Sequence, residues 1–102
     1  MPASLTEEEF SQYSGDKFRL KLNQQEIELE LAEVKGYPFG PNEQSGLERF
    51  SVFFSGPAEA RLAQGLYPLQ HESMGEFEVF LVPVAQNDQG FRYEAVFNYF
   101  KK

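Results

Sequence analysis

The stretch FEVFLVPV at residues 77–84, the loop NDQG at 87–90 and the run FRYEAVFNYF at 91–100 decide the fold class. Successive side chains of a strand point to opposite faces, and in residues 77–84 both faces are apolar. That pattern predicts a strand that is buried on both faces. The turn-forming residues between the two runs predict a β-hairpin. The first run carries Phe77, Val79 and Leu81 on one face and Phe80, Val82 and Val84 on the other.

Two shorter runs near the N-terminus predict a second hairpin. Basic side chains alternate with apolar ones in residues 17–22, and glutamates alternate with apolar ones in residues 26–31, with the turn-like NQQ between them. The outer faces therefore carry opposite charges, which attract across an antiparallel pair. The alternation changes phase between Leu31 and Val34, which predicts a β-bulge or the end of the strand.

A short helix and a long loop are predicted around this hairpin. Thr6 and Glu9 form a capping-box pattern, so residues 6–13 are predicted to be helical. Residues 36–46 are dense in Gly and Pro, which predicts an exposed loop. A further strand is predicted at residues 50–54.

Together these elements predict an all-β domain of about six mostly antiparallel strands. The regular turn signals are typical of either a small barrel or a sandwich, with the short N-terminal helix covering an open end. Residues 58–64 are predicted to form one helical turn, and Pro68 indicates an edge strand. The length of 102 residues predicts a single domain that spans residues 1–102.

Composition argues against several classes of partner. The chain has no Cys, which removes disulfides and thiolate metal sites and favours a reducing compartment, so we expect a cytoplasmic protein. The net charge is -7 and the basic residues are scattered, so nucleic acid is not an expected partner. No apolar stretch approaches the roughly 20 residues that a membrane span needs, and no signal-peptide pattern is present.

Residues that carry chemistry are sparse. His71 is the single histidine and lies in a turn-like segment, so we expect it to fix a loop rather than to catalyse a reaction. The acidic residues follow no calcium-loop spacing, and no Gly-rich phosphate loop precedes a helix, so we expect no metal or cofactor and no enzyme. The glutamates of residues 26–30 either are simply solvated, which is the commoner case, or bind a basic partner.

Aromatic residues are the main candidates for partner binding. Most of the 11 Phe residues lie at inward strand positions and belong to the core. Phe53, Phe80 and Phe100 fall opposite the face that their neighbours mark as core. In a two-layer structure they face the helix and loops, and in a bare sheet they form a patch for a partner. Tyr37 and Phe39, in the predicted loop, are further candidates.

Four ordered motifs resemble a bacterial family of small uncharacterised domains. They are FSVFF at residues 50–54, QGLYPLQH at 64–71, FLVP at 80–83 and YEAVFN at 93–98, and from first to last they cover about half the chain. Members of that family have no assigned activity and look like companions of phage-tail-collar-like proteins. The resemblance implies a structural or assembly role.

The sequence leaves two candidate functions. The expected one is non-enzymatic protein–protein interaction or assembly, with another protein or with a second copy, in a phage-derived tail-like particle. The alternative is a small-ligand-binding barrel whose aromatic-lined pocket includes polar groups such as His71 or Tyr93. Within the shared motifs we expect Asn98, like His71, to bond a neighbouring loop.

Overall fold

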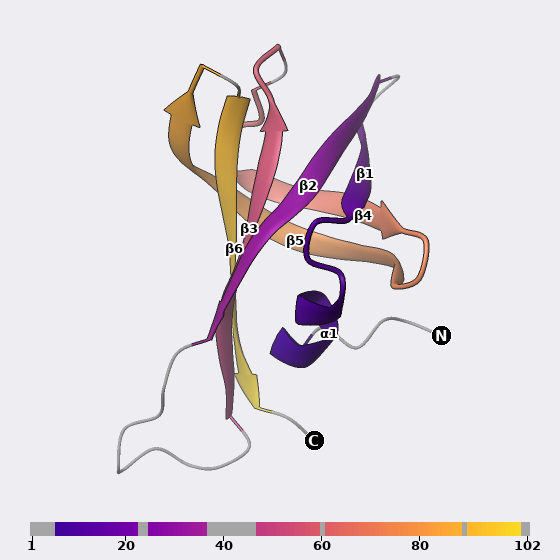
Figure 1. Ribbon diagram of the computed structural model, residues 1–102, viewed down its shortest axis with the longest axis vertical. Helices are drawn as coiled ribbons and strands as arrows, with labels where there is room; N and C mark the ends of the chain where they lie inside the picture. Colours follow the sequence, from indigo (N-terminus) through magenta and orange to yellow (C-terminus); the bar gives the residue numbers. More distant parts are fainter. Residues whose placement is uncertain (1–5, 23–24, 37–46, 60, 89, 101–102) are drawn as a thin grey trace.

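A computed structural model describes residues 6–22, 25–36, 47–59, 61–88 and 90–100 (Figure 1). The described residues form one short helix and six strands, which close into an antiparallel barrel in the order β1-β2-β3-β6-β5-β4. The all-β prediction is confirmed, and of the two predicted architectures the chain adopts the barrel. The elements are α1 (Glu7–Gln12), β1 (Lys17–Leu22), β2 (Gln25–Gly36), β3 (Leu47–Pro57), β4 (Gly65–His71), β5 (Gly75–Asn87) and β6 (Gly90–Phe100).

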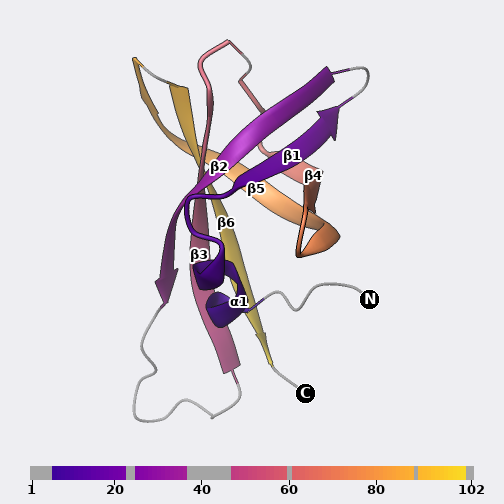
Figure 2. The same ribbon diagram turned by 45° about the vertical axis from the view of Figure 1, so that its right-hand side comes forward.

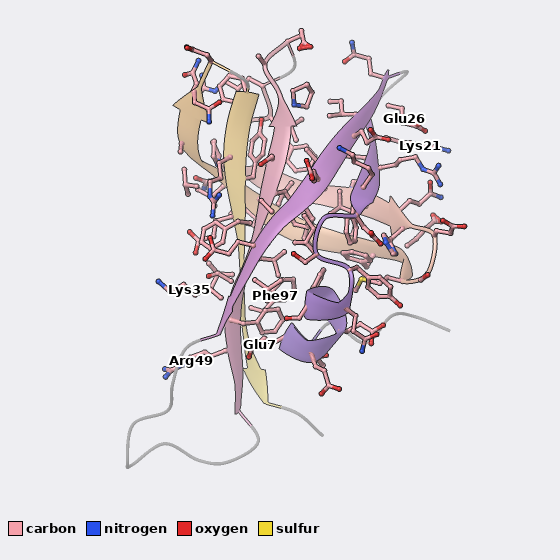
Figure 3. All side chains as sticks on the ribbon, viewed as in Figure 1. Glu7, Lys21, Glu26, Lys35, Arg49 and Phe97 are labelled. Carbon is pink, nitrogen blue, oxygen red and sulfur yellow. The ribbon has the colours of Figure 1, made fainter. Side chains whose placement is uncertain are left out.

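The β1–β2 hairpin pairs in the register that its charges predict. Lys17 lies opposite Glu30, and the next two outward pairs again join a basic residue of β1 to a glutamate of β2. Lys17 Nζ lies 3.5 Å from Glu30 Oε1, and Figure 3 shows Lys21 and Glu26 together near the tip of the hairpin. The predicted change of phase is a shift in the β2–β3 register between Leu31 and Glu33.

The inward faces of the strands fill the barrel with apolar side chains. Burying this surface is the main stabilising contribution, at roughly 25 cal/mol per Å². The fully or almost fully buried wall residues are Phe18, Leu20, Ile27, Leu29, Leu31, Phe50, Val52, Phe54, Leu69, Val79, Leu81, Tyr93 and Ala95.

Helix α1 closes one end of the barrel (Figures 1 and 2). Thr6 caps it by accepting a hydrogen bond from the backbone N–H of Glu9 at 3.1 Å. Six residues are too few for a stable isolated helix, so its packing holds it in place. The ring of Phe10 is fully buried, 5.5 to 6.5 Å from the rings of four other phenylalanines: Phe18, Phe50, Phe77 and Phe97.

The segment between β3 and β4 lies toward the opposite end, at the top of Figure 1. The helical turn predicted for residues 58–64 is wrong: the described residues there form a turn at 58–59 and then irregular chain. The backbone N–H of Leu62 donates to the hydroxyl of Tyr93 at 2.8 Å, and the Leu62 side chain is buried. A tertiary hydrogen bond has taken the donor that a helical turn would have used.

Strand β5 corrects a second prediction. Val79 and Leu81 are buried, but Phe80 on the other face is 50% exposed and Val84 is 46% exposed. The wall of the barrel is a single layer, and α1 covers an end of the barrel and leaves this wall open. The strand is therefore buried on one face and not on two.

Strand β4 is not an edge strand, contrary to the expectation from Pro68. It pairs with β5 along its whole length, and with β1 only through Arg19–Gln70 and Leu20–Leu69. Pro68 precedes that short ladder, so its missing N–H removes no bond from it. The seam between β1 and β4 is the shortest in the barrel.

Candidate functional site

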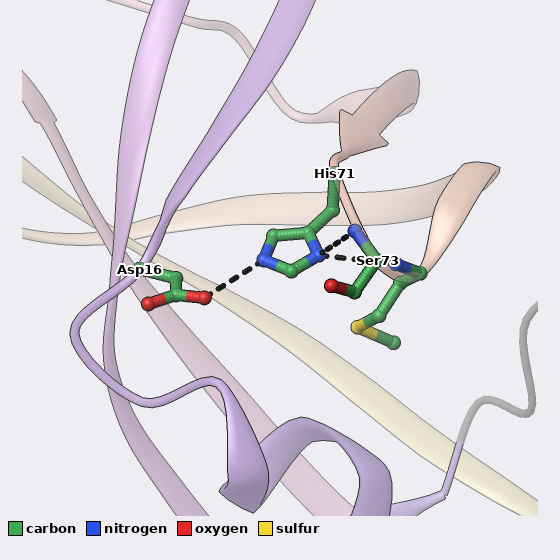
Figure 4. A network of polar contacts seen from close by, with 4 residues as sticks. Asp16, His71 and Ser73 are labelled. Carbon is green, nitrogen blue, oxygen red and sulfur yellow. Dashed lines mark hydrogen bonds and ion pairs between the residues drawn. The ribbon is translucent and has the colours of Figure 1, made fainter.

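The β1–β4 seam carries a histidine that is hydrogen-bonded through both ring nitrogens. The side chain of His71, at the end of β4, is only 4% exposed. Its Nε2 lies 3.0 Å from Oδ2 of Asp16, which directly precedes β1, and its Nδ1 accepts the backbone N–H groups of Ser73 and Met74 at 3.0 and 3.1 Å (Figure 4). These four residues are called the histidine network below.

Two aromatic rings pack against the His71 ring. It stacks on Phe18, with ring centroids 4.4 Å apart and planes inclined by 28°, and it lies 4.6 Å from the ring of Tyr13. Phe18 belongs to β1 and Tyr13 follows α1. The network therefore ties the α1–β1 connection to the β4–β5 turn across the shortest seam of the barrel.

The hydrogen bonds of His71 determine its tautomer. Because Nδ1 accepts two N–H groups it carries no proton, and the proton of the neutral ring is on Nε2, which donates to Asp16. A general base needs a free imidazole lone pair near a substrate, and here the backbone of the β4–β5 turn occupies it. The geometry is the one that a loop-fixing histidine requires.

An open groove of about 580 Å³ adjoins this network. Its walls are polar. They come from β1 and Asp16 before it, from the end of β4 and Glu72 after it, and from Glu28 of β2. Across the part of the chain that the structure describes, no group of three His, Asp or Glu side chains gathers to hold a metal ion. The groove therefore presents hydrogen-bonding and charged groups around a histidine whose ring is already engaged.

The outer wall of β4, β5 and β6 carries a second feature, which we call the outer apolar patch. Leu66 of β4 is 60% exposed and lies directly opposite Phe80 of β5. Val84 of β5 and Val96 of β6 are 46% and 62% exposed. The patch consists of these four side chains, on three strands that are neighbours in the barrel.

Of the predicted partner-binding residues whose side chains the structure describes, only Phe80 belongs to this patch, where it lies opposite Leu66. Phe53 is half buried, because the guanidinium of Arg92 lies 4.5 Å from its ring centroid while also binding Glu33 at 2.6 Å. The other predicted residues lie outside the described part of the chain: Tyr37 and Phe39 entirely, and Phe100 and Asn98 in their side chains.

Sequence reasoning missed three members of the patch. Leu66 stands two residues before Pro68, in a segment whose alternation does not show which face points inward. Val84 and Val96 alternate with the inward residues of their strands, but the sequence candidates for partner binding are all aromatic. Asp16 was also missed, because it stands 55 residues from His71 and nothing local relates the two.

The alternative function, a ligand-binding barrel, concerns the barrel interior and the grooves. Tyr93 is fully buried and its hydroxyl accepts the N–H of Leu62. Apart from the groove beside His71, a second open groove of about 640 Å³ lies between β2 and the tip of the β3–β6 pair. Both grooves are open to solvent, so an aromatic-lined internal pocket remains a prediction.

Comparison with known families matches residues 5–97 to one described as Domain of unknown function (DUF6916). The match begins well before the four motifs noted in the sequence and includes the N-terminal helix and hairpin. No curated protein and no solved structure matches the chain. None of the described helical residues forms a helix that is long and apolar enough to cross a membrane.

Proposed function

We propose that this chain, which belongs to the DUF6916 family of domains of unknown function, is a non-enzymatic protein-interaction or assembly domain. The outer apolar patch carries the proposal. Clusters of exposed apolar side chains on a soluble domain mark surfaces that another protein covers. Phe80 is its anchor, because large aromatic residues dominate the energetics of protein interfaces.

The surroundings of the patch resemble those of an interface. The exposed carboxylate of Glu78 is on the same strand as Phe80, and Glu94 of β6 lies opposite half-buried Val82. An apolar centre with charged neighbours is the usual arrangement of a surface that associates and separates. The same surface accommodates either a second copy of the chain or a different protein.

The non-enzymatic part of the proposal rests on the histidine network. The one histidine in the chain uses both ring nitrogens to hold the fold together. Two further parts of the proposal, the cytoplasmic location and the tail-like particle, rest on the sequence. The absence of Cys favours the cytoplasm, and the resemblance to a family whose members accompany phage-tail-collar-like proteins favours a phage-derived tail-like particle.

The test compares the unaltered chain with a Leu66→Ser/Phe80→Ser double variant. Both side chains point outward, so their replacement leaves the core intact while it removes the apolar centre of the patch. Glu78→Ser is the matched control, because it changes an exposed residue on the same strand without removing apolar surface. Self-association is measured by light scattering on a dilution series. We expect it to be at least tenfold weaker in the double variant, which corresponds to about 1.4 kcal/mol, and unchanged in the control.

A further inference from the structure

The wall of the barrel opens between β2 and β3. Strand β2 begins at Gln25, but its ladder with β3 begins only at the pair Glu30–Ser55. Figures 1 and 2 show the β1–β2 hairpin leaving β3 toward its tip. The open groove of about 640 Å³ lies in this opening, a volume within the range of ligand sites. Residues 25–29 of β2 thus pair with β1 on one side and with no described strand on the other.

The orientation of the free backbone groups follows from Leu31. Its N–H donates to the carbonyl of Asp16 at 2.9 Å, and its carbonyl accepts the N–H of Gly15 at 2.8 Å, so its peptide groups face the β1 side. Alternate residues of a strand direct these groups to opposite edges. Glu26 and Glu28 therefore direct their backbone N–H and C=O groups into the groove.

The charge of the groove selects the kind of partner. Four carboxylates line it, and of these Glu30 is paired with Lys17. The cation on the far wall, Arg92, binds Glu33 at 2.6 Å. Glu26 and Glu28 lie opposite Lys21 and Arg19 of β1. Within the described parts of the chain, however, neither of them, nor Glu59, makes an ion pair. The side chains that line the groove therefore carry a net negative charge.

We propose that the groove binds an extended, basic peptide segment as an added strand along residues 25–29 of β2. Main-chain hydrogen bonds to Glu26 and Glu28 give the affinity in this mode of recognition, and alternate side chains give the specificity. Side chains opposite the glutamates point outward and are lysine or arginine. Those opposite Ile27 and Leu29 point toward the core and are apolar or small.

Strand β3 lies on the other side of the groove, and its residues there are poor partners for an added strand. At this level β3 consists of Gly56 and Pro57, which already pair with β6. Pro57 has no N–H to donate. This surface is separate from the outer apolar patch, so the inference goes beyond the proposed function and does not depend on it.

The probe is an acetylated and amidated heptapeptide in which lysine alternates with threonine and valine. Its binding is measured by NMR titration and by hydrogen exchange of the β2 amides, at low salt. We expect saturable binding and slowed exchange of the Glu26 and Glu28 amides. A peptide with the same charges but N-methylated at the lysines cannot donate to β2, and we expect its binding to be lost.

Two double variants separate strand addition from general attraction to an acidic protein. Glu26→Gln/Glu28→Gln removes the two carboxylates beside the free edge, and Glu76→Gln/Glu78→Gln removes two exposed carboxylates of β5. We expect the first to weaken binding about fivefold, as two exposed charge pairs would, and the second to leave it within about twofold.

Three results would overturn the inference. They are no binding of the probe at millimolar concentration, equal binding of the N-methylated peptide, and equal effects of the two double variants. Leu66→Ser/Phe80→Ser must bind the probe as the unaltered chain does. A loss of binding in that variant would place the peptide on the outer apolar patch, which also overturns the inference.

Discussion

His71 Nε2 lies 3.0 Å from Oδ2 of Asp16, although 55 residues separate them in the chain. This contact spans the seam where β1 and β4 share only two residue pairs. A closed barrel needs every seam to hold, since an open one exposes unpaired strand edges. The histidine network and the rings of Tyr13 and Phe18 therefore support the seam that the backbone supports least.

Replacing His71 with Phe tests this role. The Phe ring keeps the contact with Phe18 but leaves the N–H groups of Ser73 and Met74 without their acceptor. The N–H of Met74 is buried and the N–H of Ser73 is partly buried. A buried donor left unsatisfied costs about 1–3 kcal/mol and a partly buried one costs less, so we expect the free energy of unfolding in urea to fall by about 2–4 kcal/mol. Glu72→Ala, in the same turn and exposed, is the control and should change it by less than about 0.5 kcal/mol. Equal stability of His71→Phe and the control would rule out the structural role.

Tyr93→Phe tests how the end of the barrel opposite α1 is closed. The hydroxyl is the acceptor for the Leu62 N–H, a buried contact at 2.8 Å. Its removal should lower the free energy of unfolding by about 1–3 kcal/mol. Tyr67→Phe removes an exposed hydrogen bond to the carbonyl of Ala63, at 2.6 Å, and should cost less than about 1 kcal/mol. Thermal denaturation followed by circular dichroism measures both variants. A larger loss of stability in Tyr67→Phe than in Tyr93→Phe would contradict the role of the buried hydroxyl.

Gly90→Ala tests the β5–β6 hairpin. Gly90 has a φ of 153°, and a Cβ there would collide with the carbonyl oxygen of Gly56. A backbone atom cannot move away without breaking the β3–β6 ladder, so we expect a loss of more than about 2 kcal/mol. At Gly65 the nearest atom to a Cβ would be Cε2 of Tyr67, at an ordinary 3.7 Å. Chemical denaturation should show Gly65→Ala close to the unaltered chain, and a tolerated Gly90→Ala would contradict the close approach.

The local parts of the fold were predictable because they depend on side-chain alternation and on charge. Opposite charges at Lys17 and Glu30 predicted the first hairpin. The loss of phase after Leu31 predicted a bulge or a strand end, and the structure has a register shift there within a continuous β2. Choice between barrel and sandwich was not predictable, because it depends on which distant strands become neighbours. The β3–β6 ladder and the β1–β4 seam join residues that no local pattern relates.

The outer apolar patch shows how the same signal supports two interpretations. Apolar residues on both faces of β5 indicated burial on both sides, yet Phe80 is half exposed. The alternation records which face each residue takes, but it does not say whether a second layer covers that face. In this chain α1 packs over an end of the barrel, so the outer wall is left exposed.

The mass in solution tests the central claim most directly. Light scattering on a dilution series of the unaltered chain, from millimolar to micromolar, should give a mass above the monomer value of 11.7 kDa that falls on dilution. The Leu66→Ser/Phe80→Ser variant should remain at the monomer mass throughout, while Glu78→Ser follows the unaltered chain. A constant 11.7 kDa for the unaltered chain at every concentration, identical to the double variant, would contradict self-assembly through the outer apolar patch.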